Sequence, residues 1–291
     1  MKPVNSFSKI IAGTMTWGLW GARLDTQAMT RLIHEVVNTG ITTFDHADLY
    51  GDYTNEADFG QAWSQTGISR DRVQLISKCG IAHVCPQRPF EVKHYNYSAA
   101  YIENACDTTL EALQTDYLDL YLLHRPSPLL DPEQVALAVE RLLQSGKIKT
   151  FGLSNFTPIQ VDLIQKHCGV SANQIEISLT MRDALYNGQL DQCLKDQIIP
   201  MAWSPLGDLV RSNAVIPEAL TNVLEEVAAS RGLTTAQVAL AWLAQHPAGI
   251  IPVVGSTKPQ RLAQAMEAMD ITLTLTEWFS LTEAATGKPC P

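Results

Sequence analysis

Four side chains of this 291-residue sequence could together transfer a proton to a carbonyl oxygen: Asp45, Tyr50, Lys78 and His124. A tyrosine ordinarily has a pKa of about 10, so it needs a lowered pKa to exchange a proton readily near neutral pH. A lysine ammonium stabilises the phenolate, and a carboxylate paired with the lysine keeps it charged. We therefore predict that Lys78 and Asp45 lower the pKa of Tyr50. His124 would donate a hydrogen bond to the carbonyl oxygen and orient it.

Each of these residues also has an ordinary structural explanation when it is taken alone. Asp45 could cap a helix, Lys78 could be solvated at a strand end, and His124 could be a hydrogen-bonded core histidine. A metal site is the competing chemical hypothesis, with the ligands drawn from Asp45, His46, Asp48 and His124. However, no H-x-H pair occurs in the chain. We therefore predict no metal and keep a metal-dependent barrel hydrolase as an alternative.

The elements that would position these residues form a repeating pattern of strand and helix. Asp131-Pro132 and Thr157-Pro158 are typical helix starts, and Gln160 would complete a capping box with Thr157. The predicted strands are 9–12, 42–45, 73–77, 118–123, 149–153, 172–175, 199–202 and 250–253.

Eight strands alternating with helices predict an α/β fold, a single-domain (β/α)8 TIM barrel over residues 1–291. An open doubly wound sheet is the alternative, but its G-x-G-x-x-G fingerprint is missing. Val135, Val139, Leu142 and Leu143 should form the buried stripe of a helix that ends at Ser145-Gly146. Residues 82–97, after the third strand, are predicted to be a long loop.

In such a barrel the carboxyl ends of all the strands meet at one face, which carries the chemistry. Polar or small residues follow nearly every predicted strand there: Gly13, Thr14, Met15, Asp45, Lys78, His124, Ser154, Asn155, Gln174, Trp203, Ser204, Gly255 and Ser256. Tyr50 would join them from the loop after the second strand.

Several of these segments resemble the aldo-keto reductase family, and the likeness covers almost the whole chain. GITTFDHADLYG resembles the signature around the family's aspartate and tyrosine, with His46 where threonine is commoner; ISKCG holds the strand lysine and LDLYLLHRP the histidine. DHAD-x-YG and ISKCGI are most similar to a bacterial subgroup, the YdhF-like oxidoreductases. The resemblance implies a complete catalytic tetrad and reduction of an aldehyde or ketone to an alcohol, with Tyr50 as proton donor and no metal.

The resemblance also implies an NADP(H) site. GLSNF and NQIE would hold the nicotinamide amide through Ser154, Asn155 and Gln174, and Trp203 of WSPLG would stack on its ring. Pro259 would start a helix whose N-terminus suits an anion, and Lys258 and Arg261 would favour NADPH over NADH. The other implied cofactor residues are Gly13, Thr14, Met15, Asp45, Ser204, Leu206, Gly207, Gly255, Ser256 and Gln264; the family often has Glu and Asn where Gln264 and Ala265 stand.

Composition limits the partners. The net charge is −9 and no basic run is present, which disfavours binding to nucleic acid. No stretch approaches the roughly 20 apolar residues of a membrane span, and six scattered cysteines without a C-x-x-C pair suggest reduced thiols. We expect a soluble, cytoplasmic monomer or weak oligomer that acts on a small-molecule carbonyl compound and binds neither membrane nor nucleic acid.

The substrate pocket should include Trp17, Trp20, Tyr53 and His124, with the 82–97 insert at its mouth. Aromatic side chains there suit apolar or ring-bearing carbonyl compounds, although sugars stack on them too. The alternative from another functional class is a cofactor-bound regulatory or scaffold barrel with little turnover. A complete tetrad argues against this alternative, because a binding role does not require those four side chains together.

Overall fold

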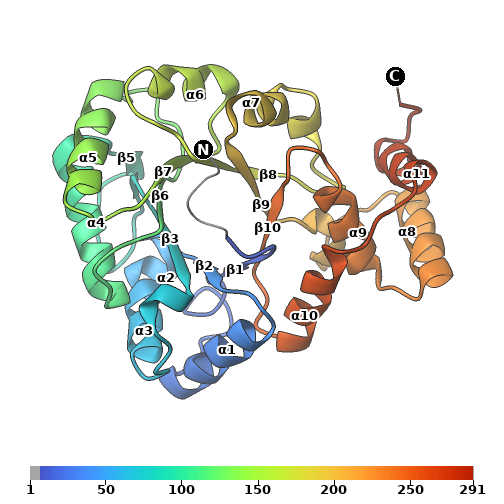
Figure 1. Cartoon of the computed structure of the whole chain (residues 1–291), viewed down its shortest axis with the longest axis horizontal. Helices are drawn as coiled ribbons and strands as arrows, with labels where there is room; N and C mark the ends of the chain where they lie inside the picture. Colours follow the sequence, from blue (N-terminus) through green and yellow to red (C-terminus); the bar gives the residue numbers. More distant parts are fainter. Residues whose placement is uncertain (1–6, 291) are drawn as a thin grey trace.

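The computed structural model describes residues 7–290, and its centre is a closed barrel of eight parallel strands (Figure 1). Going round the barrel, each strand pairs with the next and β10 returns to β1. Each predicted strand overlaps one barrel strand, so the (β/α)8 prediction is confirmed. The barrel strands are β1 (Ile11–Gly13), β2 (Thr43–Asp45), β3 (Gln74–Cys79), β6 (Leu120–Leu123), β7 (Phe151–Ser154), β8 (Ala172–Glu176), β9 (Ile199–Trp203) and β10 (Ile251–Val254).

The insert after β3 differs from the predicted loop. It contains a short antiparallel hairpin, β4 (Ile81–Ala82) and β5 (His94–Tyr95), in which Ile81 pairs with Tyr95 and Ala82 with His94. Strands of two residues leave no alternating pattern in a sequence, which is why the prediction missed them.

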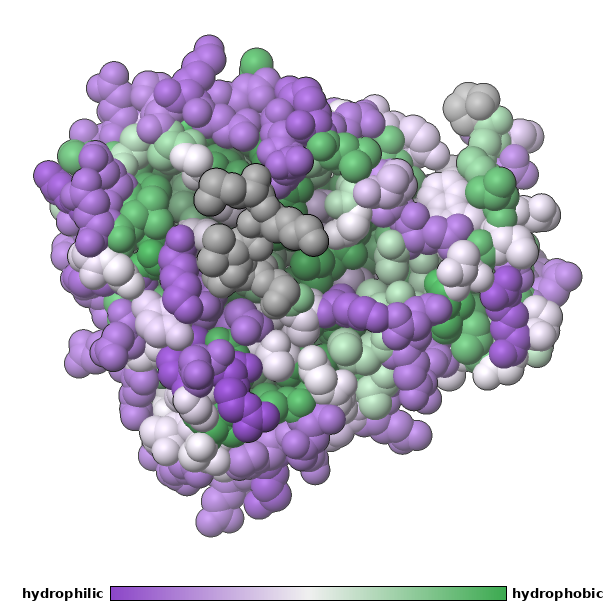
Figure 2. All heavy atoms as spheres, in the orientation of Figure 1, coloured by the Kyte–Doolittle hydropathy of each residue, from purple (hydrophilic) through white to green (hydrophobic). Residues whose placement is uncertain are grey.

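Helices surround the barrel, and Figure 2 shows hydrophilic side chains over much of their outer surface on this face. The predicted starts of two helices are confirmed: Asp131 accepts a hydrogen bond from the Glu133 amide at 2.9 Å, and Gln160 accepts one from the Thr157 amide at 3.0 Å. The helices are α1 (Thr26–Asn38), α2 (Tyr50–Tyr53), α3 (Asn55–Trp63), α4 (Ala99–Leu113), α5 (Pro132–Gln144), α6 (Pro158–Gln165), α7 (Gln189–Asp196), α8 (Glu218–Arg231), α9 (Thr235–Ala244), α10 (Pro259–Ala268) and α11 (Leu275–Thr286).

The buried stripe of α5 consists of Val135, Val139 and Leu142, as predicted, but Leu143 is 43% exposed. One residue further along a helix is turned by about 100°, which takes Leu143 off the buried face.

Helices α8 and α11 pack against one another outside the ring of helices, at the right of Figure 1. Trp278 of α11 stacks on Trp242 of α9 with ring centroids 5.3 Å apart, and its Nε1 donates to the Trp242 carbonyl oxygen at 2.9 Å. These contacts attach α8 and α11 to α9. Within residues 7–290, none of the helices has the length and apolar character to cross a membrane.

The interior of the barrel is filled with side chains. Ile11, Ile76, Leu120, Leu122, Ala172, Met201 and Val253 form one buried apolar cluster. The barrel is therefore a packed core rather than a pore, and a ligand must bind at an end of it.

A buried glutamate links β3 to two helices outside the barrel. Glu56 of α3 accepts hydrogen bonds from Ser77 at 2.5 Å and from Thr109 of α4 at 2.9 Å. Burial raises the pKa of Glu56 to about 7, although the two hydroxyl donors act to lower it. The folded protein therefore favours the protonated form of the Glu56 carboxyl group.

Replacement of Glu56 by Gln should change how stability depends on pH. Glu56 would ionise near pH 4.5 in the unfolded chain and near pH 7 in the folded protein. Its stabilising contribution is therefore complete below about pH 4.5 and is lost as the pH rises through 7. We expect the free energy of unfolding of the wild type, relative to Glu56→Gln, to fall by up to about 3 kcal/mol over this window.

Urea unfolding at a series of pH values measures this difference. The matched control is Glu111→Gln, on the exposed side of α4. An equal pH dependence for the two variants would contradict the assignment.

Candidate active site

The candidate site is built around the buried ammonium group of Lys78 on β3. Lys78 is 0% exposed, and its Nζ donates to Asp45 Oδ2 at 2.7 Å, to the His46 carbonyl oxygen at 2.7 Å and to Tyr50 Oη at 3.3 Å. Burial acts to lower the pKa of Lys78, but Asp45 and the other acceptors outweigh it and leave the pKa above its usual value. The lysine is therefore charged, with three acceptors for its three protons.

Tyr50 begins the short helix α2, directly after the segment that follows β2. The chain then takes the left-handed conformation at Gly51, Asp52 and Tyr53, with φ of 60°, 55° and 68°. The Tyr50 ring lies edge-on to His124, with centroids 5.9 Å apart, and 6.1 Å from Trp20. This local geometry brings the phenol and the imidazole together at one mouth of the barrel.

The predicted lowering of the Tyr50 pKa is wrong for the protein without ligands. Burial raises the pKa of Tyr50, and the Lys78 charge lowers it by less, in part because Asp45 counteracts that charge. The phenol is therefore protonated at neutral pH, as a proton donor must be. Lys78 can stabilise the phenolate only after the proton has left.

His124 follows β6, and its amide donates to the Cys79 carbonyl oxygen at 2.9 Å. Burial lowers its pKa well below the usual value, and the positive charges of Lys78, Arg125 and Lys93 lower it further. The imidazole is consequently neutral. A neutral imidazole carries one N–H, which suits it to orient a carbonyl oxygen by hydrogen bonding.

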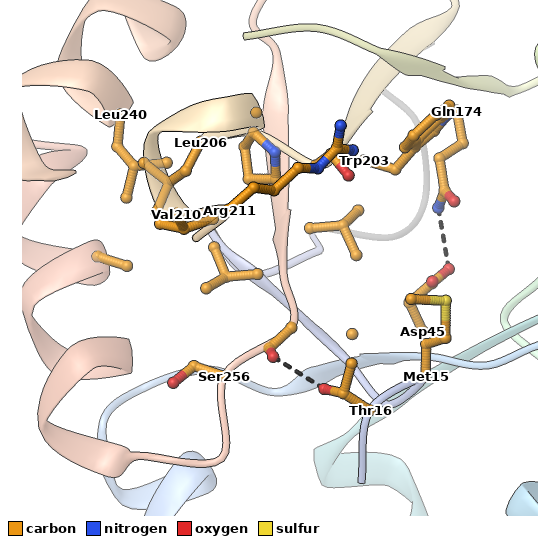
Figure 3. Close-up of a pocket in the computed structure, with 18 of the residues that line it drawn as sticks. Met15, Thr16, Asp45, Gln174, Trp203, Leu206, Val210, Arg211, Leu240 and Ser256 are labelled. Atoms are coloured by element: carbon orange, nitrogen blue, oxygen red, sulfur yellow. Dashed lines mark hydrogen bonds between the residues drawn. The ribbon is translucent and has the colours of Figure 1, made fainter. Parts of the chain in front are cut away.

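A cavity of about 1060 Å³ extends from Tyr50 and His124 toward α10. Figure 3 shows Gln174 hydrogen-bonded to Asp45 at one side of it, with Leu206, Val210 and Leu240 at the other. The cavity contains nearly all the sequence-predicted cofactor residues: Gly13, Met15, Asp45, Ser154, Asn155, Gln174, Trp203, Ser204, Leu206, Gly207, Gly255, Ser256, Arg261 and Gln264.

The amide side chains in the cavity are held by hydrogen bonds. Asn155 Nδ2 donates to Ser154 Oγ at 2.9 Å, and Asn155 Oδ1 accepts from Trp203 Nε1 at 2.9 Å. Gln174 Nε2 donates to Asp45 Oδ1 at 2.9 Å. A flat indole face beside two fixed amides can hold a planar ring that bears a carboxamide.

The far end of the cavity is suited to phosphate groups. Arg261 lines it within the first turn of α10, which starts at Pro259 as predicted, and Gln264 and Ala265 lie one turn further on. Gly207 must be glycine here, because its φ is +51° and a Cβ would lie 2.1 Å from Thr180 Oγ1.

Besides Lys78, which is buried behind Asp45 and Tyr50, four predicted site residues do not line the cavity. Trp17 is fully buried against Phe44 and Phe59 in the core. The Tyr53 hydroxyl donates to the Ile81 carbonyl oxygen and accepts from the His83 amide, so the side chain is engaged with the insert.

The other two lie beside the cofactor end. Thr14 is buried, and its hydroxyl donates to the Asp45 carbonyl oxygen. Lys258 is the N-cap residue of α10, and its side chain is not among those that line the cavity. Trp20 and His124, by contrast, lie in the cavity as predicted.

The four residues considered as metal ligands do not come together around one point. Lys78 occupies one oxygen of Asp45, and His46 is buried with Nδ1 3.0 Å from Thr14 Oγ1 and its ring against Phe59. Burial, and then the nearby Glu56, raise the pKa of Asp48. Over the described part of the chain, no three His, Cys, Asp or Glu side chains are grouped as metal ligands.

Sequence reasoning missed several residues that line the cavity. Three are cations, Lys93, Arg125 and Arg211, and three belong to α9: Ala236, Gln237 and Leu240. Arg125 had an available signal, because it directly follows His124 at the same strand end. No sequence signal marked the α9 residues, because that helix is apolar on nearly all sides and is mostly buried.

The barrel, the buried Asp45–Lys78–Tyr50 contacts and the adjoining His124 define a class of oxidoreductase, and a family model confirms it: residues 9–286 match the aldo/keto reductase family, to which this chain belongs. The subgroup resemblance is confirmed as well. The chain is 38% identical to the oxidoreductase YdhF of Escherichia coli K12, over 98% of this chain and 96% of the relative.

Two further relatives cover nearly the whole chain. A 6-dehydroglucose reductase of Agrobacterium fabrum is 35% identical over 99% of both chains. The crystal structure of an aldo/keto reductase from Klebsiella pneumoniae, in complex with NADP and acetate, has a TM-score of 0.79 and 28% identity, covering 98% of this chain and 93% of that one. The family and its relatives therefore support an oxidoreductase.

A double-mutant cycle can test the buried ion pair without any measurement of activity. Lys78→Met leaves the buried Asp45 carboxylate without its countercharge, and we expect a loss of about 3–5 kcal/mol in the free energy of unfolding. The Lys78→Met/Asp45→Asn double variant should lose less than the sum of the two single variants. Urea unfolding measures all four proteins. Additive losses would show that the two groups do not interact.

Proposed function

We propose that this chain is an NADPH-dependent reductase that converts an aldehyde or ketone to an alcohol, with Tyr50 as the proton donor. The observation that carries the proposal is the Lys78 ammonium group, buried between the Asp45 carboxylate and the Tyr50 hydroxyl beside a neutral His124. The Agrobacterium relative is named as a reductase of 6-dehydroglucose, and this name supports an aldehyde as the substrate class.

The residues of the cavity fit a nicotinamide dinucleotide. Trp203 offers a flat face, and Ser154, Asn155 and Gln174 offer fixed polar groups for the carboxamide. Arg261 and the N-terminus of α10 would hold a phosphate at the adenosine end. When bound, NADPH supplies the hydride for the carbonyl carbon and is oxidised to NADP⁺.

The protein's own groups would act on the carbonyl oxygen. His124 donates a hydrogen bond that orients the carbonyl group, and Tyr50 gives its phenolic proton to the oxygen as the C–O bond becomes single. The resulting phenolate is stabilised by Lys78, which Asp45 keeps in place. Solvent protons then restore the phenol.

Tyr50→Phe should nearly abolish turnover. Loss of a positioned general acid lowers kcat by about 10²–10⁴-fold, while NADPH binding should persist because the phenol is not part of the cofactor cradle. The assay is NADPH oxidation with 4-nitrobenzaldehyde, together with fluorescence titration of NADPH binding. The matched control is Tyr53→Phe, which removes a hydroxyl outside the cavity and should keep most of the turnover.

Full activity in Tyr50→Phe would show that the mechanism is wrong. Tight NADPH binding without turnover of any carbonyl compound in a broad panel would instead support the regulatory or scaffold role.

The preference for NADPH should depend on Arg261 more than on Lys258, because only Arg261 lines the cavity. We expect Arg261→Met to raise the KM for NADPH by about tenfold, the loss of one charge-assisted contact, with a smaller change for NADH. Steady-state kinetics with each cofactor measures this difference. Arg72→Met, on the exposed turn that precedes β3, is the matched control. An equal change for both cofactors would contradict the assignment.

A further inference from the structure

Two cations that the proposed mechanism does not use lie at the substrate end of the cavity. Arg125 and Lys93 both line it together with Tyr50, His124 and Trp20. Among residues 7–290, neither forms an ion pair with a carboxylate. Two unpaired cations at one mouth are notable in a chain of net charge −9.

Two carboxylates near this mouth, Asp52 and Glu176, form no ion pair with Arg125 or Lys93 within the described residues. Asp52 accepts a hydrogen bond from Trp20 Nε1 at 2.9 Å and lies 3.3 Å from His83 Nε2. Burial raises the pKa of Glu176, and Arg211 and Arg125 act to lower it. Glu176 nevertheless forms no ion pair with Arg125 in the described part of the chain. The charges of Arg125 and Lys93 therefore stay available, and both act on His124.

Arg125 is held in place through its backbone. The Arg125 amide donates to Tyr97 Oη at 3.2 Å, and the Tyr97 hydroxyl donates to the Arg125 carbonyl oxygen at 2.5 Å. Gly80 makes room for this clamp, because its φ is +105° and a Cβ there would lie 1.9 Å from the Tyr97 ring. The guanidinium group lies 5.6 Å from the centroid of the Trp203 ring, beside the expected nicotinamide position.

Lys93 comes from the insert. It directly precedes β5, whose pairing with β4 fixes its place against the end of β3. The hairpin that sequence analysis did not foresee therefore has a specific consequence. It brings a second positive charge to the cavity from the segment after β3, the strand next to β6, which Arg125 follows.

We propose that Arg125 and Lys93 form a subsite for an anionic group, so that the preferred substrates are aldehydes or ketones that carry a carboxylate or a phosphate; this inference rests on the proposed function. The guanidinium fork matches either anion in a bidentate manner, and the lysine adds a point charge. Because the cations lie beside the reacting groups rather than on them, they bind the remote part of the substrate and leave the carbonyl group to Tyr50 and His124.

The test compares benzaldehydes whose remote para substituent is either anionic or neutral. The probes are 4-formylbenzoate, 4-formylphenyl phosphate and the neutral methyl 4-formylbenzoate, with saturating NADPH. The variants are Arg125→Met, Lys93→Met and Arg125→Lys. Lys166→Met, which removes one exposed positive charge at the end of α6, is the matched control. For each substrate, the ratio of variant to wild type cancels the intrinsic reactivity of the aldehyde.

We expect Arg125→Met to raise the KM for an anionic aldehyde about tenfold more than for the ester, the effect of one lost charge-assisted hydrogen bond. The change should fall on KM more than on kcat, because a remote contact is made in the ground state and the transition state alike. Arg125→Lys should recover part of the loss, and added salt should raise the KM for the anionic aldehydes only. Whichever anion shows the larger effect identifies the group that the subsite takes.

Equal changes for charged and neutral aldehydes would overturn the inference, as would equal effects of Arg125→Met and Lys166→Met. A wild-type preference for neutral hydroxylated aldehydes over the anionic ones would also overturn it. These outcomes leave carbonyl reduction itself intact. Failure of the wild type to reduce any of the three probes or 4-nitrobenzaldehyde would instead count against the proposed function, and the subsite would fall with it.

Discussion

The buried ion pair of Lys78 and Asp45 is the interaction on which the rest of the site depends. Burying two charges is costly, and their attraction offsets the cost only when the remaining hydrogen bonds are also satisfied. Here the third proton of Lys78 reaches Tyr50, and Gln174 of β8 occupies the second oxygen of Asp45. Residues from three barrel strands are thereby joined through one carboxylate. A closed barrel can hold them rigidly, because every strand is paired on both sides.

This arrangement also explains why Tyr50 carries its proton before reaction. Burial dominates the pKa of Tyr50 and raises it, and Asp45 offsets part of the opposing effect of Lys78. The phenol is thus protonated in the resting protein, as the proposed role of proton donor requires. The same environment lowers the pKa of His124 and keeps the imidazole neutral, as its proposed role of orienting a carbonyl oxygen requires.

Much of the fold and the site could be predicted from the sequence, because strand ends are visible as polar residues after β-branched runs. What could not be predicted was the direction of individual side chains in the loops. Trp17 and Trp20 are three residues apart, yet the first packs in the core and the second lines the cavity. Tyr53 looked like a pocket residue, but its hydroxyl is engaged with the insert. Such outcomes depend on tertiary contacts that local pattern does not encode.

The cations of the cavity divide it into two regions with different structural origins. Arg261 belongs to α10, at the cofactor end, whereas Lys93 comes from the β4–β5 insert at the mouth. On a chain of net charge −9, these local charges make the cavity the favourable place for anions. The insert does not contribute to the Lys78–Asp45 pair, so under the proposed function changes in the insert would alter substrate binding and leave the geometry of that pair unchanged. In the proposed function, the catalytic groups therefore lie at strand ends, and the residues that select the substrate lie in loops.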